Sequence, residues 1–128
     1  MNAQITALYT ALTAFLFIVL SYKATMQRRR SKIGLGVGED EMLERAVRVQ
    51  ANLAEYAPIA LLLMLVYELN SGSVWLLHVA GTVLVIARVL HAQGLGSTRG
   101  TSFGRFYGVL GTWGVILVMA VANIWRLL

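Results

Sequence analysis

The chain has 128 residues, of which 58% are apolar and only 13% are charged, and this composition excludes an ordinary soluble domain, in which about a quarter of residues carry charge. The absence of cysteine excludes disulfides, thiolate zinc sites and a cysteine nucleophile of the protein's own. The net charge of +5 comes with no basic soluble face or nucleic-acid-reading element, so we expect a membrane protein with no nucleic-acid partner.

Four apolar segments follow one another along the chain, at residues 3–24, 46–69, 74–92 and 103–128. Each can cross a hydrocarbon core, which takes about 20 helical residues. They are too long for strands and show no period of two, and backbone groups in lipid must bond within their own segment. We therefore predict an all-α integral membrane protein, with residues 1–128 forming one four-helix bundle. The first segment lacks the basic start and cleavage pattern of a signal peptide, so we expect it to be retained.

Rows of small residues occur on two of the expected helices, where they allow helices to approach closely in lipid. The rows are Thr6, Thr10 and Ala14 in the first helix and Gly104, Gly108 and Thr112 in the fourth. Both predict ordinary helix packing within a compact bundle.

The links between the helices differ in character. The first, at residues 26–44, is basic, then glycine-rich, then acidic, whereas residues 70–73 form a tight polar turn that makes the second and third helices antiparallel neighbours. Ten of the eleven Lys and Arg residues lie in or beside the first link and the third, at residues 93–102, and only Arg126 lies at the opposite end. Basic loops stay in the cytoplasm, so both termini are predicted on the non-cytoplasmic side.

The second helix carries the most informative polar residues. At 100° per residue, Arg48, Asn52 and Glu55 fall within about 60° of one another, with Tyr56 at the edge of that face. An ionisable side chain inside a membrane costs about 2.5–3.5 kcal/mol, so we expect the three groups to converge on a water-filled crevice. Arg48 alone would be an interfacial arginine, but together the three suit a zwitterionic, peptide-like ligand. Pro58 is expected to kink the helix just beneath them.

The third helix supplies a second polar pair. Arg88 and His91 are three residues apart and share a face. An anchoring arginine with a capping histidine is as good an interpretation as a functional pair. His78 lies on another face and is interpreted as structural, and two histidines on separate faces do not form a metal site.

The run from Arg48 to Pro58 has the pattern Arg-x-Gln-x-Asn-x-x-Glu-Tyr-x-Pro, which resembles the signature of the MAPEG superfamily, the membrane-associated proteins of eicosanoid and glutathione metabolism. A weaker match lies at residues 87–94. The resemblance implies a homotrimer with glutathione bound between neighbouring subunits close to the cytoplasmic surface. The short loops resemble those of small bacterial members, which implies a bacterial inner membrane protein.

The resemblance also implies roles for individual side chains. The residues implied to hold glutathione are Arg48, Asn52, Glu55, Tyr56, Arg88 and His91, with Gln50 and a basic residue among Arg28, Arg29 and Arg30 reaching in from the adjacent subunit. An arginine near the start of the fourth helix is implied to stabilise the thiolate, and the candidates are Arg105 first and Arg99 second. His91 and Leu95 stand where the eicosanoid-forming branch has tyrosines, which argues against eicosanoid synthesis.

The function implied is a glutathione-dependent membrane transferase or peroxidase that attacks a hydrophobic electrophile, with glutathione as co-substrate and no metal. A thiol has a pKa near 8.5, and a neighbouring guanidinium lowers that pKa by favouring the anion. Two alternatives stay open. One is a small four-helix exporter in which Glu55 binds a proton or a cationic drug, although such exporters usually place their carboxylate on the first helix. The other is a non-catalytic membrane protein that retains the ligand site.

Overall fold

The computed structural model describes residues 2–97 and 100–128, and all regular structure within these ranges is helical. The helices are α1 (Gln4–Ser31), α2 (Glu41–Leu69), α3 (Val74–Ser97) and α4 (Phe103–Trp125). Each is long and apolar enough to cross a membrane. The predicted all-α, four-helix membrane architecture is therefore confirmed.

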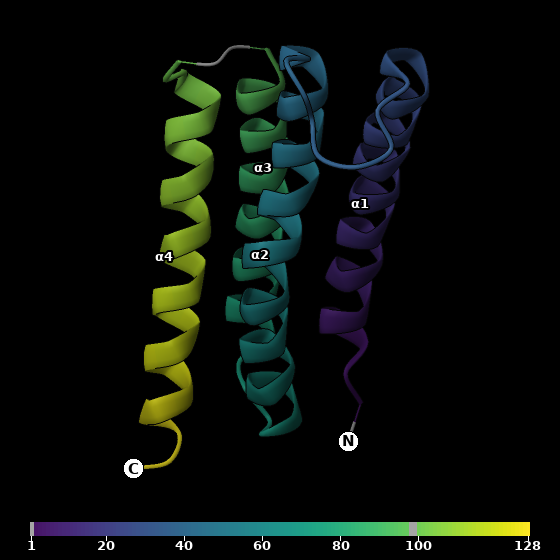
Figure 1. The fold of residues 1–128 in the computed structure, drawn as a ribbon. Helices are drawn as coiled ribbons and strands as arrows, with labels where there is room; N and C mark the ends of the chain where they lie inside the picture. The colour runs from purple at the N-terminus through teal and green to yellow at the C-terminus, as the bar shows by residue number, and fades with distance from the viewer. Residues whose placement is uncertain (1, 98–99) are drawn as a thin grey trace.

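The four helices run side by side, with α2 and α3 between α1 on one flank and α4 on the other (Figure 1). α1 packs against α2 and α3, and α4 packs against α3 and α2. Both termini lie at one end of the bundle, and the α1–α2 link and the start of α4 lie at the other (Figure 1). We call this second end the basic end, because the charged residues near the α1–α2 link are there.

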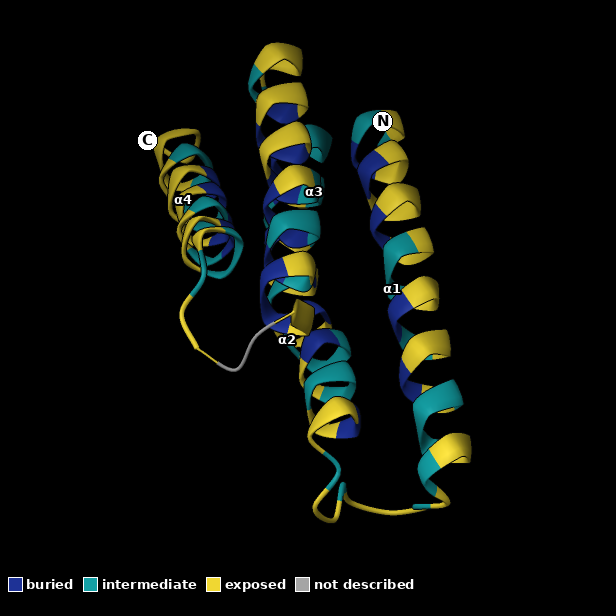
Figure 2. Ribbon diagram, turned by 90° about the horizontal axis from the view of Figure 1, so that it is seen from above, coloured by how far each residue is buried: buried dark blue, intermediate teal, exposed yellow. Residues whose placement is uncertain are grey.

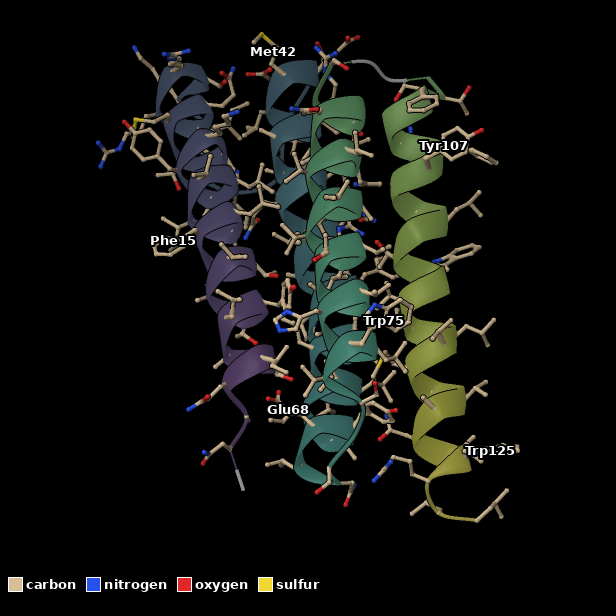
Figure 3. The ribbon with its side chains drawn as sticks, turned by 180° about the vertical axis from the view of Figure 1, so that it is seen from behind. Phe15, Met42, Glu68, Trp75, Tyr107 and Trp125 are labelled. Atoms are coloured by element: carbon tan, nitrogen blue, oxygen red, sulfur yellow. The ribbon has the colours of Figure 1, made fainter. Side chains whose placement is uncertain are left out.

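Residues coloured as buried lie on the sides of the helices that face their neighbours, and exposed residues lie on the outer sides (Figure 2). One core cluster, which includes Tyr9, Met64 and Met119, joins all four helices, and a second, which includes Leu20 and Leu53, lies among α1, α2 and α3. Large apolar and aromatic side chains also cover the outside, and Phe15, Trp75 and Trp125 are labelled in Figure 3. An apolar exterior of this kind is what a lipid-facing surface requires.

The small-residue row of α4 packs against α3 as predicted. A Cβ atom added at Gly104 would lie 2.5 Å from the Leu90 carbonyl oxygen, and one at Gly108 would lie 2.6 Å from that of Ala87. Because these neighbours are backbone atoms, a larger residue has no room. The glycines set how closely α4 approaches α3.

The row predicted for α1 is wrong. Thr6 is buried, but Thr10 and Ala14 are exposed, and Tyr9 and Thr13 face inward instead. The Tyr9 hydroxyl donates to the His78 carbonyl oxygen at 3.1 Å and contacts His78 Nδ1 at 3.0 Å. A buried phenol needs such partners, so these bonds orient α1 more strongly than the small residues do.

The predicted first link was too long. α1 continues to Ser31 and α2 begins at Glu41, so the link shrinks to residues 32–40. The arginines of the last turn of α1 suit the negative end of that helix. The Asp40 carboxylate accepts the backbone N–H groups of Met42 and Leu43 at 2.9 and 3.0 Å and so caps α2. Between the two helices the chain turns through Gly36 and Gly38, both with positive φ.

The other helix ends depart less from expectation. α3 continues beyond residue 92 to Ser97. Gly94 has no side chain where α3 passes the first turn of α4, so the two helices fit together there and α3 is not interrupted. α4 ends at Trp125 rather than at residue 128. Pro58 lies within α2, which stays helical on both sides of it, and the size of the expected kink stays a prediction.

At the end opposite the basic end, α2 stabilises the start of α1. The Glu68 carboxylate accepts the backbone N–H groups of Ile5 and Thr6 at 2.9 and 2.7 Å. Ala3, at the N-cap of α1, supplies no side-chain cap of its own. Glu68, labelled in Figure 3, therefore replaces a local cap and fixes α1 against the end of α2.

Candidate functional site

The candidate site is the α2 polar face, which we define as Arg48, Asn52, Glu55 and Tyr56. The opposite side of α2 is buried against the other helices through Leu43, Val49, Leu53 and Ala57. That packing fixes the rotation of α2 and leaves the polar residues on its flank. Glu55 lies fourteen residues after the helix start at Glu41. At 1.5 Å per residue this is about 21 Å, near the middle of a helix about 43 Å long.

Arg48 and Glu55 form an ion pair along this face. The Arg48 guanidinium nitrogens lie 3.4–3.5 Å from the Glu55 carboxylate oxygens. The two side chains keep 52% and 50% of their surface exposed in the single chain. Charge-assisted bonds of this type are usually about 2.7–2.9 Å long, so the pair is loose and opens outward.

Asn52 faces inward and is held by Arg88. The Arg88 guanidinium donates to Asn52 Oδ1 at 2.5 Å and to Thr112 Oγ1 at 3.3 Å, which ties α2, α3 and α4 together. Arg88 is only 2% exposed. Because a guanidinium has donors only, the Asn52 oxygen is occupied and the amide N–H groups are left to bind a further acceptor. Arg88 is thus a buried, positioning residue rather than the interfacial anchor that was its alternative interpretation.

His91 is also buried, at 2% exposure, and packs against Gly108 of α4. Its Nδ1 atom has no hydrogen-bond partner among the described residues. Because α3 continues to Ser97, His91 does not lie at the helix end, and the interpretation as a capping histidine is wrong. The expected shared face of Arg88 and His91 is present, but it faces the interior of the bundle.

The residues expected to act from an adjacent subunit lie near the basic end. Gln50 is half-buried on α2, and Arg29 and Arg30 are exposed in the last turn of α1. The Arg28 guanidinium donates to the Ile33 and Gly36 carbonyl oxygens at 3.4 and 2.6 Å, so it is engaged in the α1–α2 link. Of the three arginines, Arg29 and Arg30 are left to contact a neighbour.

The first-choice thiolate arginine, Arg105, lies in the first turn of α4 at the basic end. Its backbone N–H donates to Ser102 Oγ at 3.2 Å, which caps the helix, and its guanidinium donates to the Gly100 carbonyl oxygen at 3.4 Å. The second candidate, Arg99, lies outside the described residues. Tyr56, the last member of the α2 polar face, is half-buried.

The single chain does not form the expected crevice. Arg48 and Glu55 pair on the outer surface, whereas Asn52 binds Arg88. The three groups therefore share a face without enclosing a space between them. Sequence reasoning also missed Thr112 as a partner of Arg88 and Arg45 as a second arginine on α2 with a buried Nε atom. The place of Thr112 in the predicted small-residue row could have indicated its contact with α3. No sequence pattern indicated the buried Nε atom of Arg45.

Comparison with known proteins gives consistent matches. The model of the MAPEG family matches residues 6–125. The chain is 34% identical over 122 residues to the inner membrane protein YecN of Escherichia coli strain K12, which covers 95% of this chain and 92% of that protein. The YecN protein of the E. coli O6:H1 strain CFT073 matches with the same identity and coverage.

Proposed function

The chain belongs to the MAPEG family, and from that premise we propose that it is a glutathione-dependent transferase or peroxidase that acts on hydrophobic electrophiles in a bacterial inner membrane. Its E. coli relative YecN is named an inner membrane protein, which supports the location. The four apolar helices support an integral membrane protein.

The loose Arg48–Glu55 ion pair is the observation that carries this proposal. Its contacts of 3.4–3.5 Å leave both charges available to a ligand that brings the opposite ones. Glutathione is a zwitterion, so a carboxylate of the tripeptide would bind Arg48 and its ammonium group would bind Glu55. Asn52, whose oxygen is held by Arg88, would donate its amide N–H groups to a peptide carbonyl oxygen.

A homotrimer would complete the site. Arg48 and Glu55 are half-exposed on a membrane helix, where an uncovered charge costs about 2.5–3.5 kcal/mol. A second copy of the chain packed against the α2 polar face would remove that cost and enclose the ligand. In this arrangement Gln50 and either Arg29 or Arg30 of the adjacent subunit would reach the tripeptide.

The chemistry requires the thiolate. A guanidinium from Arg105 or Arg99 beside the sulfur would lower the thiol pKa from its usual value near 8.5, and arginine stays charged even when partly buried. In transfer, the thiolate forms a bond to carbon and the leaving group departs. In peroxide reduction, the thiolate attacks a peroxide oxygen, the O–O bond breaks, and the departing alkoxide takes up a proton to give the alcohol. The glutathione sulfenic acid formed then reacts with a second glutathione to give the disulfide and water. A hydrophobic electrophile would enter from the lipid.

An exporter based on Glu55 is less well supported. In such an exporter the carboxylate must be free to bind its cargo, but Glu55 is already paired with the cationic Arg48. Helix α1, where such exporters usually place their carboxylate, has no acidic residue.

Glutathione retention in neutral detergent tests the proposal directly. We expect wild type to bind immobilised glutathione and Arg48→Ala to lose at least tenfold in affinity, because truncating one partner of a charge-assisted contact costs about 1.5–3 kcal/mol. Arg126→Ala, which removes one positive charge at the opposite end of the bundle, is the matched control and should bind as wild type does. Equal binding by wild type and Arg48→Ala, or no binding by either, would overturn the proposal.

The thiolate step is tested separately. Ultraviolet absorbance of bound glutathione should report thiolate in wild type and less in Arg105→Ala or Arg99→Ala. Binding without thiolate would identify a non-catalytic protein that retains the ligand site. Proton-driven efflux from vesicles that disappears in Glu55→Gln would support the exporter instead.

A further inference from the structure

A cavity of about 580 Å³ lies at the basic end among α1, α2 and α3, and it is distinct from the α2 polar face. The α2 residues that line it, among them Met42, Arg45 and Val49, centre about 100° around the helix from Arg48 and Glu55. Met42, labelled at this end in Figure 3, marks its position. The volume falls within the roughly 300–1,000 Å³ typical of small-molecule sites.

Three cationic side chains line this cavity: Lys23 and Arg30 from α1 and Arg45 from α2. Lys23 and Arg30 are seven residues apart and so lie on one face of α1. No carboxylate occurs among the described residues of the lining. Gln27 in the lining does bond to Asp40, but that carboxylate is already occupied by the Ser31 hydroxyl and by two backbone N–H groups.

Arg45 adds a second, independent observation. Its Nε atom is shielded from solvent and has no hydrogen-bond partner within residues 2–97 and 100–128. A terminal nitrogen of Arg45 donates only weakly, to the Ser97 carbonyl oxygen at 3.4 Å. A shielded N–H donor with no acceptor is an unfavourable arrangement that an anion in the cavity would correct.

Most of the remaining lining is apolar, with Leu20, Met26, Val49 and Ala92 among its residues, and Gln27, Gln93 and Ser97 add uncharged polar groups. A soluble anion would gain nothing from the apolar side chains, whereas a phospholipid would place its glycerol and upper acyl carbons against them. The cavity also lies at the end of membrane-spanning helices, where headgroups are. Basic pockets between membrane helices are suited to anionic headgroups.

We propose that this cavity binds the phosphodiester headgroup of an anionic phospholipid, with Lys23, Arg30 and Arg45 as its ligands. Arg30 is also a candidate contact for glutathione, so the independence of this site from the glutathione proposal depends on Lys23 and Arg45, which take no part in the α2 polar face. An anionic lipid held there would bridge α1 to α2 and α3 at the basic end.

Native mass spectrometry of the protein in neutral detergent, titrated with phosphatidylglycerol or phosphatidylcholine, tests the proposal. We expect wild type to bind phosphatidylglycerol at least tenfold more tightly than phosphatidylcholine. Each basic side chain near a headgroup contributes roughly fivefold in affinity, so Lys23→Gln/Arg45→Gln should lose about 20- to 30-fold for phosphatidylglycerol. The matched control Lys32→Gln/Arg126→Gln removes two exposed positive charges that do not line the cavity and should keep the preference.

A second variant fills the cavity without changing charge. A Cβ atom at Gly96, which lines the cavity, would meet only Val49 Cγ2 at 3.9 Å, so Gly96→Leu is tolerated and its side chain occupies the space. We expect it to lose the preference for phosphatidylglycerol. Gly114→Leu on α4, where an added Cβ meets nothing within 4 Å, should keep it.

Three outcomes would overturn the lipid assignment. The first is equal binding of the two lipids by wild type, and the second is an equal loss of affinity for phosphatidylglycerol in the control variants. The third is saturation of the site by glycerol 3-phosphate as readily as by lipid, which would identify a site for soluble anions. Glutathione retention measured on the same variants separates the two proposals, because Lys23→Gln/Arg45→Gln should retain glutathione binding. Failure to bind glutathione together with an intact lipid preference would count against the proposed function alone.

Discussion

At the scale of single residues, Arg88 is the side chain with the most demanding environment. It is buried on α3 and carries a positive charge within a membrane helix, and within the described residues its guanidinium donates to Asn52 and Thr112. A buried charge is tolerated when its hydrogen bonds are satisfied, and removing one partner costs more than removing both. The polar cluster therefore behaves as one unit, so the effects of substituting its members on the free energy of unfolding should not be additive.

Asn52→Leu tests this coupling. We expect it to lower the free energy of unfolding by about 1–3 kcal/mol, because the Arg88 guanidinium loses its closest acceptor. The double variant Asn52→Leu/Arg88→Met should recover most of that loss, since no charge is left unpaired. Thr112→Val, which removes the longer 3.3 Å contact, should cost less, about 0.6 kcal/mol. Unfolding in mixed detergent micelles measures all three, and a double variant less stable than Asn52→Leu would contradict the coupling.

Asp40, in the α1–α2 link, gives the protein a defined acid response. Hydrogen bonds from the Ser31 hydroxyl, the Leu43 backbone N–H and the Gln27 amide lower the pKa of Asp40 from its ordinary 3.8 to about 2. A lowered pKa means that the ionised carboxylate stabilises the fold. This contribution is complete above about pH 4 and is lost as the pH falls through about 2.

Asp40→Asn should keep the cap on α2, because asparagine is as good an N-cap, but lose this pH dependence. We expect the thermal midpoint of wild type to fall more steeply between pH 5 and pH 2 than that of Asp40→Asn. Glu39→Gln, an exposed neighbour in the same link that caps no helix, should follow wild type. Parallel curves for wild type and Asp40→Asn would show that the Asp40 bonds do not stabilise the fold.

The residues of the α2 polar face could be predicted from their spacing, but their partners could not. Helical periodicity places Arg48, Asn52 and Glu55 on one flank without any knowledge of the other helices. The bond from Arg88 to Asn52 depends on the rotation and depth of α3 relative to α2, which no local pattern encodes. For the same reason the spacing did not predict that, in the single chain, Arg48 reaches two turns along its own helix to Glu55, and the expected crevice stays a prediction.

At the scale of helices, α3 and α4 approach each other closely at two glycines. Gly104 and Gly108 on α4 face the carbonyl oxygens of Leu90 and Ala87 on α3. In lipid, such close approach replaces the hydrophobic drive that packs helices in water. The contact also holds Thr112, two turns after Gly104, where it can accept from Arg88.

Gly108→Leu should break this contact. Its Cβ atom alone would lie 2.6 Å from backbone, so α4 must move, and we expect a loss of about 1–3 kcal/mol in unfolding free energy. Gly114→Leu is the matched control on the same helix, where an added Cβ meets nothing. Because leucine favours the helical conformation more than glycine does, this variant should be as stable as wild type or up to about 1 kcal/mol more stable. If the two variants unfold alike, the glycine contact does not determine how α4 packs.

Helix ends were harder to predict than helix centres. Hydropathy marks the apolar part of a span, but α1 and α2 continue past it through charged residues that favour helix ends, up to Ser31 and from Glu41. On α1 the small-residue row failed because a buried tyrosine hydroxyl, that of Tyr9, found its partners on α3 and set the rotation. Polar partners across an interface outweigh small size when both compete for the same face.

At the scale of the whole molecule, the two proposed sites lie in separate places in the half of the bundle nearest the basic end. The α2 polar face is uncovered in the single chain and suits a second copy, whereas the cavity at Lys23 and Arg45 lies among helices of the same chain. The cavity lies at the end that carries most of the basic residues, and the α2 polar face extends from near that end to the middle of α2. If that end faces the cytoplasm, glutathione and the anionic lipids of the inner leaflet would each reach their site directly.

The orientation of the chain can be tested cleanly because the sequence contains no cysteine. The positive charges beside the α1–α2 link predict that this link is cytoplasmic and that both termini are not. We expect a membrane-impermeant maleimide to label Leu128→Cys, but not Leu35→Cys, in right-side-out spheroplasts, and to label them in the reverse order in inside-out vesicles. Both native side chains are more than nine-tenths exposed, so access to the reagent is limited by the membrane alone. Labelling of Leu35→Cys from outside would place the basic end, and with it both proposed sites, away from the cytoplasmic supply of glutathione.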